Sequence, residues 1–201
     1  EVLKGYAKLI DPWTVEIALN DGGIQTLTAR SIVIATGARP FVPDLPGLDE
    51  TGYVTSDTLW DKFAKLDKAP SKLVVLGGGP IGCELAQAFA RLGSAVTQIE
   101  RGTRLMKKED VEVSVFAQES LTESGVTILT SQQAIRCETR DGKKYIIVAP
   151  KGSTDDQQET AIEYDELICA VGRSARLERY GLDTLGIDTE RTISTDEYLE
   201  T

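Results

Sequence analysis

The chain contains no histidine in its 201 residues. Histidine is the commonest general acid–base and metal ligand of proteins, so its absence excludes Ser-His and Zn-His chemistry. Positive charge is also scarce, because 22 Lys and Arg face 32 Asp and Glu, for a net charge of −10. That balance argues against nucleic acid and anionic membranes as partners. The sequence has no apolar run of about 18 residues and no signal-peptide pattern, so nothing suggests membrane insertion or export.

Cysteine is sparse as well. The three cysteines, Cys83, Cys137 and Cys169, stand far apart and form no C-x-x-C or C-x-x-x-x-C pair. A redox dithiol within one segment is therefore absent, and we expect three small buried side chains in a reducing compartment. The chain is accordingly predicted to be cytoplasmic, and no metal site is predicted.

What the chain does have is an apolar strand that runs directly into G-x-G-x-x-G. The motif consists of Gly77, Gly78, Gly79, Pro80, Ile81 and Gly82. Gly77 permits the tight turn from strand to helix, Gly79 lets the backbone approach a pyrophosphate, and Gly82 lets the helix pack closely on the strand. The first turn of that helix points free N–H groups and a positive dipole end at the phosphates.

The residues after the glycines complete a βαβ unit. A helix is predicted from about Pro80 to Arg91 and a second strand from Ala95 to Ile99. Glu100 ends that strand, 18 residues past Gly82, where an acidic side chain can bind a ribose. A glycine turn that only joins strand to helix is the alternative, but the full context favours a dinucleotide site. The helix is predicted to face inward through Ile81, Leu85, Ala88, Phe89 and Leu92.

The identity of the nucleotide depends on the residues around Glu100. Its carboxylate can accept two hydrogen bonds from the ribose of NAD and repels the 2′-phosphate of NADP. Three basic residues nevertheless place positive charge nearby, at Arg101, Arg104 and Lys107. These bases can equally form a solvated loop that balances the neighbouring acids. The sequence favours NAD and leaves NADP open.

The N-terminal region reads as short strands. A first strand is expected within residues 2–9, and Thr14–Leu19 and Ile24–Ala29 flank the turn Asn20–Gly23 as a hairpin. Ser31–Gly37 is a nearly continuous apolar run, which predicts a strand buried on both faces. Three prolines then mark an extended crossover, at Pro40, Pro43 and Pro46.

The region from 46 to 172 predicts an α/β unit with further elements. An amphipathic helix is expected over Glu109–Ser124, with Val111, Val115 and Leu121 inward. The other expected elements are a short helix at 58–65, parallel strands at 126–129 and 167–172, and a three-stranded antiparallel meander at 132–137, 144–149 and 160–164, with a polar loop at 151–159. From residue 173 the chain becomes loop-rich. Both ends look cut, so a fragment of a longer chain is expected.

Three motifs in order resemble a known family: Ala35-Thr36-Gly37-Ala38, the Gly77–Glu84 fingerprint and Ala170-Val171-Gly172-Arg173. They are similar to those of class I pyridine nucleotide–disulfide oxidoreductases, FAD enzymes of the mercuric reductase and lipoamide dehydrogenase type. The resemblance implies a Rossmann-like parallel sheet and meander that form an NAD(P)-binding domain at 46–172. It further implies partial FAD-domain segments on either side, at 1–45 and 173–201.

The resemblance also implies roles for individual residues. Gly5 and Ala7 match a segment whose backbone touches the FAD adenine, and Thr36 and Gly37 match a segment on the FAD adenosine half. Gly172 matches the loop beside the nicotinamide, Ala134 a backbone contact to the nucleotide adenine, and Arg101 and Lys107 the pair that clamps a phosphate. Glu84 matches a catalytic glutamate near the flavin–nicotinamide contact, which pairs with a lysine that this chain lacks.

The motifs that bind FAD and carry out the chemistry of the family are missing from this sequence. These are the G-x-G-x-x-G for FAD, the C-x-x-x-x-C and the C-terminal dimerisation domain with its catalytic histidine. The resemblance implies a homodimeric parent in which hydride passes from nicotinamide to FAD and electrons go on to a disulfide or a metal ion such as Hg(II). The chain alone is expected to bind NAD(P)H without catalysis. An isolated dinucleotide-binding module or NAD sensor is the alternative, and the sequence does not identify the electron acceptor.

Overall fold

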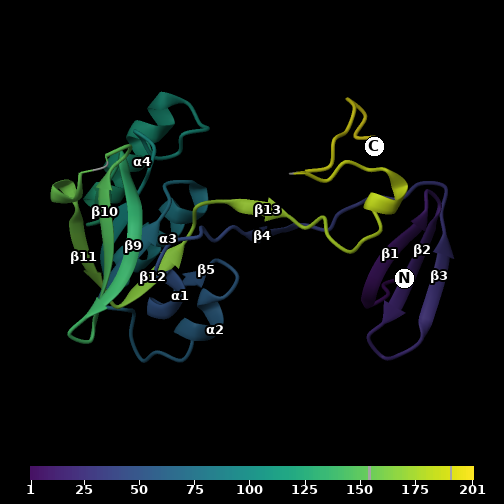
Figure 1. The fold of residues 1–201 in the computed structure, drawn as a ribbon, viewed down its shortest axis with the longest axis horizontal. Coiled ribbons are helices and arrows are strands. Elements are labelled where there is room, and N and C mark those ends of the chain that lie inside the picture. The colour runs from purple at the N-terminus through teal and green to yellow at the C-terminus, as the bar shows by residue number, and fades with distance from the viewer. Residues whose placement is uncertain (154, 191) are drawn as a thin grey trace. The chain divides into compact units, whose positions relative to one another are not determined.

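Five parallel strands form the central sheet of residues 40–173 (Figure 1). In the computed structural model, which describes residues 1–153, 155–190 and 192–201, the strand order is β5-β12-β6-β7-β8. The strands are β5 (Val54–Thr55), β12 (Glu166–Cys169), β6 (Lys72–Leu76), β7 (Ala95–Ile99) and β8 (Thr127–Leu129). Their residues are mostly buried, as a parallel sheet covered on both faces requires.

Helices cover one face of this sheet. They are α2 (Leu59–Phe63), α3 (Pro80–Arg91) and α4 (Val111–Glu123), which pack on Leu73, Val75 and Val96. The bounds of α3 match the sequence prediction, because Pro80 fits the first helical turn and Gly93 follows the end. Its predicted face was wrong in part: Ala88 and Leu92 are exposed, and Gly82, Cys83, Ala86 and Phe89 are buried. Small side chains let α3 approach the sheet along that stripe.

The predicted antiparallel meander is present, and it covers the other face of the sheet. Its strands are β9 (Gln132–Arg140), β10 (Lys143–Pro150) and β11 (Thr160–Tyr164), in the order β11-β10-β9, with a 3-10 turn η1 (Asp156–Gln158) between β10 and β11. Together with α1 (Leu48–Thr51), it packs on Val74, Leu76 and Ile99. The buried Tyr164 hydroxyl donates a hydrogen bond to Thr51 Oγ1 at 2.9 Å, which joins the meander to α1.

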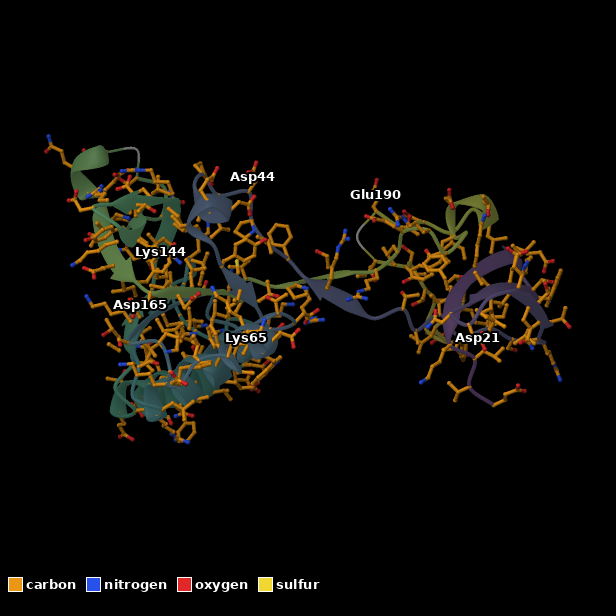
Figure 2. The ribbon with its side chains drawn as sticks, turned by 90° about the horizontal axis from the view of Figure 1, so that it is seen from below. Asp21, Asp44, Lys65, Lys144, Asp165 and Glu190 are labelled. Atoms are coloured by element: carbon orange, nitrogen blue, oxygen red, sulfur yellow. The ribbon has the colours of Figure 1, made fainter. Side chains whose placement is uncertain are left out.

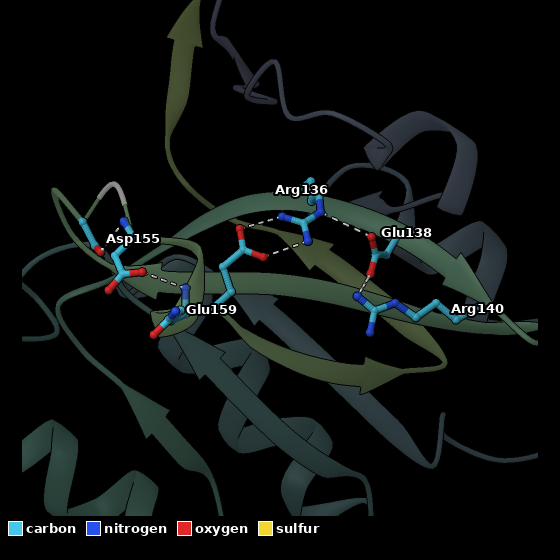
Figure 3. A network of polar contacts seen from close by, with 7 residues as sticks. Arg136, Glu138, Arg140, Asp155 and Glu159 are labelled. Carbon is cyan, nitrogen blue, oxygen red and sulfur yellow. Dashed lines mark hydrogen bonds and ion pairs between the residues drawn. The ribbon is translucent and has the colours of Figure 1, made fainter.

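The outer surface of the meander carries charged side chains (Figure 2), some of which form ion pairs (Figure 3). Arg136 donates two hydrogen bonds to Glu159, at 2.7 and 2.8 Å, and a third to Glu138 at 3.3 Å. Glu138 also pairs with Arg140. This network ties the end of the η1 segment to β9. Elsewhere on the meander, the Lys144 ammonium donates to the Asp165 carbonyl at 3.4 Å.

Residues 1–39 and 174–201 form a second unit. It contains the antiparallel strands β1 (Gly5–Asp11), β2 (Thr14–Leu19) and β3 (Ile24–Thr28), with Asp21 at the hairpin turn (Figures 1 and 2). The Leu9 N–H donates to the Tyr180 carbonyl at 2.9 Å, so the returning chain flanks β1. A 3-10 turn, η2 (Asp183–Leu185), follows. The chain passes between the units in β4 (Ala38–Pro40) and β13 (Arg173–Ala175), which pair with each other.

Two further sequence predictions were wrong. Ser31–Gly37 is not a strand and is not buried, and Val33 is 87% exposed. Among the described residues no strand pairs with it, and an apolar run becomes a buried strand only beside such a neighbour. In α4, Val111 and Val115 point outward, whereas Ser114 and Leu121 are buried. The Ser114 hydroxyl donates to the Leu105 carbonyl, which turns that face of α4 inward.

No helix within the described part of the chain is long and apolar enough to cross a membrane.

Candidate dinucleotide-binding site

The candidate site lies at the carboxyl edge of the central sheet. The register pairs Cys169 with Leu76 and Leu76 with Ile99, so the residues that follow each strand come side by side. A cavity of about 880 Å³ opens at this edge. In open α/β sheets, ligands bind outside the carboxyl ends of the strands. Of the predicted residues, those lining the cavity are Gly77, Gly78, Gly79, Pro80, Ile81, Glu100, Arg101, Lys107, Ala134 and Gly172.

Three glycines of the loop differ in the space beside them. Gly77 has φ of 116°, and a Cβ there would stand 2.4 Å from the Ala170 carbonyl oxygen. A Cβ at Gly82 would stand 2.3 Å from the Gly77 carbonyl oxygen, so this glycine lets α3 start close to the turn. At Gly79, by contrast, a Cβ would meet no atom within 4 Å. The open space beside Gly79 is what a phosphate approaching the backbone needs.

The N-terminal end of α3 borders the cavity through Gly79, Pro80 and Ile81. No side chain caps this end. The first backbone N–H groups of a helix have no partner within the helix, and the helix dipole favours negative charge there. This end of α3 is therefore suited to bind an anion.

Glu100 is fixed by two backbone groups. Its Oε2 accepts the Gly78 N–H at 2.6 Å, and its Oε1 accepts the Gly102 N–H. The carboxylate is half-buried at the cavity wall, and each oxygen keeps a further lone pair. It can therefore hold the loops and still accept hydrogen bonds from a sugar.

Residues 101–110, which we call the strap, run over the glycine loop after Glu100. The Met106 N–H donates to the Gly78 carbonyl at 2.7 Å. The Arg104 guanidinium donates to three strap carbonyls, at 2.9 to 3.3 Å, and this residue is not in the cavity lining. Arg104 therefore stabilises the strap instead of supplying charge to the cavity. Arg101 and Lys107 are exposed and line the cavity.

The opposite walls come from segments distant in sequence. Ala134 lines the cavity together with Gln132 and Gln133 of β9, two residues that sequence reasoning missed. Gly172, with φ of 144°, accepts the Phe41 N–H at 2.9 Å. Phe41, likewise not predicted, is about half-exposed and lines the cavity beside it.

Several predicted residues lie outside this cavity. Glu84 is exposed on α3 and does not line it, and Gly82 packs beneath the loop instead. Gly5, Ala7, Thr36 and Gly37 belong to the unit of residues 1–39 and 174–201. There a Cβ at Gly5 would stand 2.3 Å from the Ala18 carbonyl oxygen, and the Thr36 hydroxyl donates to the Arg176 carbonyl at 2.6 Å.

The cysteines are buried and free, as expected from the sequence. Cys169 lines the cavity, and burial raises its pKa to about 11. Burial also raises the pKa of Cys83 and of Cys137. Since the thiolate is the reactive form, none of the three is set up as a nucleophile. Among the described residues, no cluster of three or more acidic or cysteine side chains could hold a metal ion.

One polar residue under the loop was not predicted from the sequence. Gln98 lies within β7 and is fully buried, and its Nε2 donates to the Gly77 carbonyl at 3.0 Å. The available signal was a glutamine inside an otherwise strand-like, buried run, because a buried amide requires a partner.

The fold and this edge define an α/β protein with a Rossmann-type sheet. The model of the pyridine nucleotide-disulphide oxidoreductase family matches residues 1–201. The chain belongs to this family.

Individual relatives support this family assignment. A mercuric reductase of Streptomyces lividans is 39% identical over 203 residues, which cover 100% of this chain and 41% of that protein. A dihydrolipoamide dehydrogenase of Chaetomium thermophilum is 36% identical, over 98% of this chain and 39% of that protein. The structure of the HOCl-induced flavoprotein disulfide reductase RclA from Escherichia coli superposes with a TM-score of 0.78 at 27% identity, over 100% of this chain and 43% of that one. The chain thus spans about two fifths of the length of these relatives.

Proposed function

We propose that residues 40–173 bind a nicotinamide dinucleotide, NAD(H) in preference to NADP(H), in an FAD-dependent oxidoreductase. The observation that carries this proposal is the open space beside Gly79, which the N-terminus of α3 and the Glu100 carboxylate border. The residues present fit a dinucleotide: helix N–H groups for the pyrophosphate and a carboxylate for the ribose.

The remaining contacts of the proposal follow from the resemblance. Ala134 would touch the adenine side and Gly172 the nicotinamide side, and both line the cavity. Arg101 and Lys107 would meet a 2′-phosphate if NADP(H) binds. Glu84 would act where nicotinamide and flavin meet. In the other unit, Gly5, Ala7, Thr36 and Gly37 would contact the FAD.

In this proposal the chain's residues bind and orient, and the cofactors carry the redox chemistry. A bound reduced nicotinamide supplies a hydride equivalent. The glycine loop and α3 fix the pyrophosphate, and Glu100 fixes the ribose, so the nicotinamide is held in one orientation. The whole protein would pass the electrons through FAD to a disulfide or a metal ion and would act as a homodimer.

Replacing Gly79 tests the nucleotide site. Gly79 has φ of −79° and ψ of 179°, which any residue adopts, so Gly79→Asp fits the fold. Its carboxylate would enter the space assigned to the pyrophosphate. Like charges about 4 Å apart near a protein surface repel by on the order of 4 kcal/mol before salt screening. We expect NADH affinity, measured by fluorescence titration, to fall at least about tenfold.

Ala88→Asp is the matched control, because Ala88 is exposed on α3, the helix that follows Gly79, and does not line the cavity. It adds the same charge and should leave NADH affinity unchanged. If the wild-type chain binds neither NADH nor NADPH saturably, or if Gly79→Asp binds as tightly as wild type, the proposed site is wrong. A flavin absorbance spectrum of the full-length protein tests the FAD-dependent activity separately, and a colourless protein would favour a nucleotide-binding module without catalysis.

A further inference from the structure

A single peptide group of the glycine loop is held from both sides, by a side chain of strand β7 and by that of the residue directly after the strand. The Gln98 Nε2 donates to the Gly77 carbonyl at 3.0 Å, and the Glu100 Oε2 accepts the Gly78 N–H at 2.6 Å. The Gly77 carbonyl and the Gly78 N–H belong to the same peptide bond. Gln98 and Glu100 stand two residues apart, so their side chains project from the same side of the strand. We call this pair of side chains the peptide clamp.

We propose that Gln98 is a positioning residue for nucleotide binding, which acts by holding the Gly77–Gly78 peptide in the orientation that the dinucleotide requires. The inference rests on the proposed function of the same site. A peptide group between two adjacent glycines rotates more freely than any other, because neither residue has a Cβ. A rotation of this peptide would break the Glu100–Gly78 hydrogen bond and move the N–H groups that follow it toward α3.

The surroundings of Gln98 favour this role over simple packing. The side chain is fully buried, and its Oε1 has no hydrogen-bond partner among the described residues. Besides the Gly77 carbonyl, the Gln98 Nε2 also donates to the Cys83 sulfur at 3.6 Å, which is a weak acceptor. A buried amide with one unpaired end is costly, and an apolar side chain would avoid that cost. The contact that an apolar side chain could not make is the one to the Gly77 carbonyl.

The position of that carbonyl explains why it must be held. A Cβ at Gly82 would stand 2.3 Å from it, so the carbonyl lies directly under the first turn of α3. Gly77 itself has φ of 116°, a conformation that glycine adopts readily and leaves readily. Gln98 therefore controls the point where the strand turns into the helix that borders the cavity.

Two substitutions at Gln98 separate positioning from packing. Gln98→Met keeps the length of the side chain and removes the donor, and we expect NADH to bind about fivefold more weakly.

Gln98→Glu restores a donor only while the carboxyl is protonated. Burial and the nearby Glu100 carboxylate raise the pKa of such a carboxyl, and the buried Cys83 thiol beside it stays neutral. The ratio of the NADH dissociation constant of Gln98→Glu to that of wild type should approach one near pH 5.5 and rise toward pH 8.5. The same ratio for Gln98→Met should not vary with pH.

Gln87→Met is the matched control. The Gln87 amide donates to the Ser120 and Ser124 hydroxyls at 3.0 Å and so links α3 to α4, away from the loop. It should lower the unfolding temperature without changing NADH affinity. If Gln98→Met behaves in the same way, Gln98 only packs the fold and the clamp proposal is wrong.

A measurement without nucleotide separates the two proposals. Hydrogen exchange of the Gly78 amide should accelerate at least about fivefold in Gln98→Met, because the peptide is held from one side only. If wild type binds no nucleotide, the proposed function fails. If wild type binds but Gln98→Met shows unchanged affinity and unchanged exchange at Gly78, only the clamp fails.

Discussion

The Glu100 carboxylate accepts the Gly78 N–H at 2.6 Å, so the acid assigned to the ribose is also a structural part of the glycine loop. Its second oxygen accepts the Gly102 N–H, which joins the start of the strap to the same carboxylate. Hydrogen bonds to a charged acceptor are the stronger kind. Removing the acid should therefore affect both the stability of this edge and the choice of nucleotide.

Glu100→Ala should destabilise the chain by roughly 1–3 kcal/mol, because two backbone N–H groups lose their acceptor. NADH and NADPH should both bind more weakly, since the loop loosens. NADH should lose more than NADPH, because the ribose loses its acceptor while the repulsion of a 2′-phosphate disappears. Urea unfolding and parallel fluorescence titrations with the two nucleotides measure these effects.

Glu112→Ala is the control for that variant, because Glu112 is exposed in the first turn of α4 and does not line the cavity. It should leave both affinities and their ratio unchanged. An unchanged ratio of NADH to NADPH affinity in Glu100→Ala would refute the assignment of Glu100 to the ribose, even if stability falls as expected.

Gly82→Ala and Gly79→Ala should have opposite profiles. A Cβ at Gly82 would stand 2.3 Å from the Gly77 carbonyl oxygen, so the helix or the turn must move, at a cost of about 1–3 kcal/mol. A Cβ at Gly79 meets no atom within 4 Å, and the backbone conformation suits alanine. Its stability should stay within about 0.5 kcal/mol of wild type, while nucleotide affinity falls. Equal unfolding midpoints for the two variants would contradict these steric assignments.

The central βαβ unit was predictable because its signals are local. Glycine and proline mark the bounds of α3, and the apolar run Ala95–Ile99 forms β7 as predicted. The strand predicted at Ser31–Gly37 failed because a strand requires a distant partner that no local pattern reports. The buried face of α3 was also misjudged, since close approach to the sheet favours Gly82 and Ala86 over larger apolar side chains.

The lining of the candidate cavity was predictable to a similar extent. The glycine loop and Glu100 share a continuous signature, and the structure places both at one cavity. Phe41, which follows β4, and Gln132 of β9 reach that cavity through tertiary packing, which no local sequence pattern reports. The role of Gln98 depends on which carbonyl its amide meets. Arg104 shows the reverse case. Its charge suggested a phosphate contact, but its guanidinium donates hydrogen bonds to carbonyls of the strap.

The meander should lose part of its stability in acid, through Glu159 (Figure 3). The hydrogen bonds from Arg136 hold the pKa of Glu159 below its usual value, so the ionised form favours the folded state. This contribution is complete above the unfolded pKa of about 4.3 and disappears as the pH falls through the lowered folded pKa. Wild type should therefore exceed Glu159→Gln in urea midpoint by a constant amount from about pH 6 to 8, and the difference should shrink below about pH 4. Glu119→Gln, at an exposed position of α4, should show no such difference. A gap between wild type and Glu159→Gln that persists unchanged in acid would contradict the assignment of this stability to the ionised Glu159–Arg136 pair.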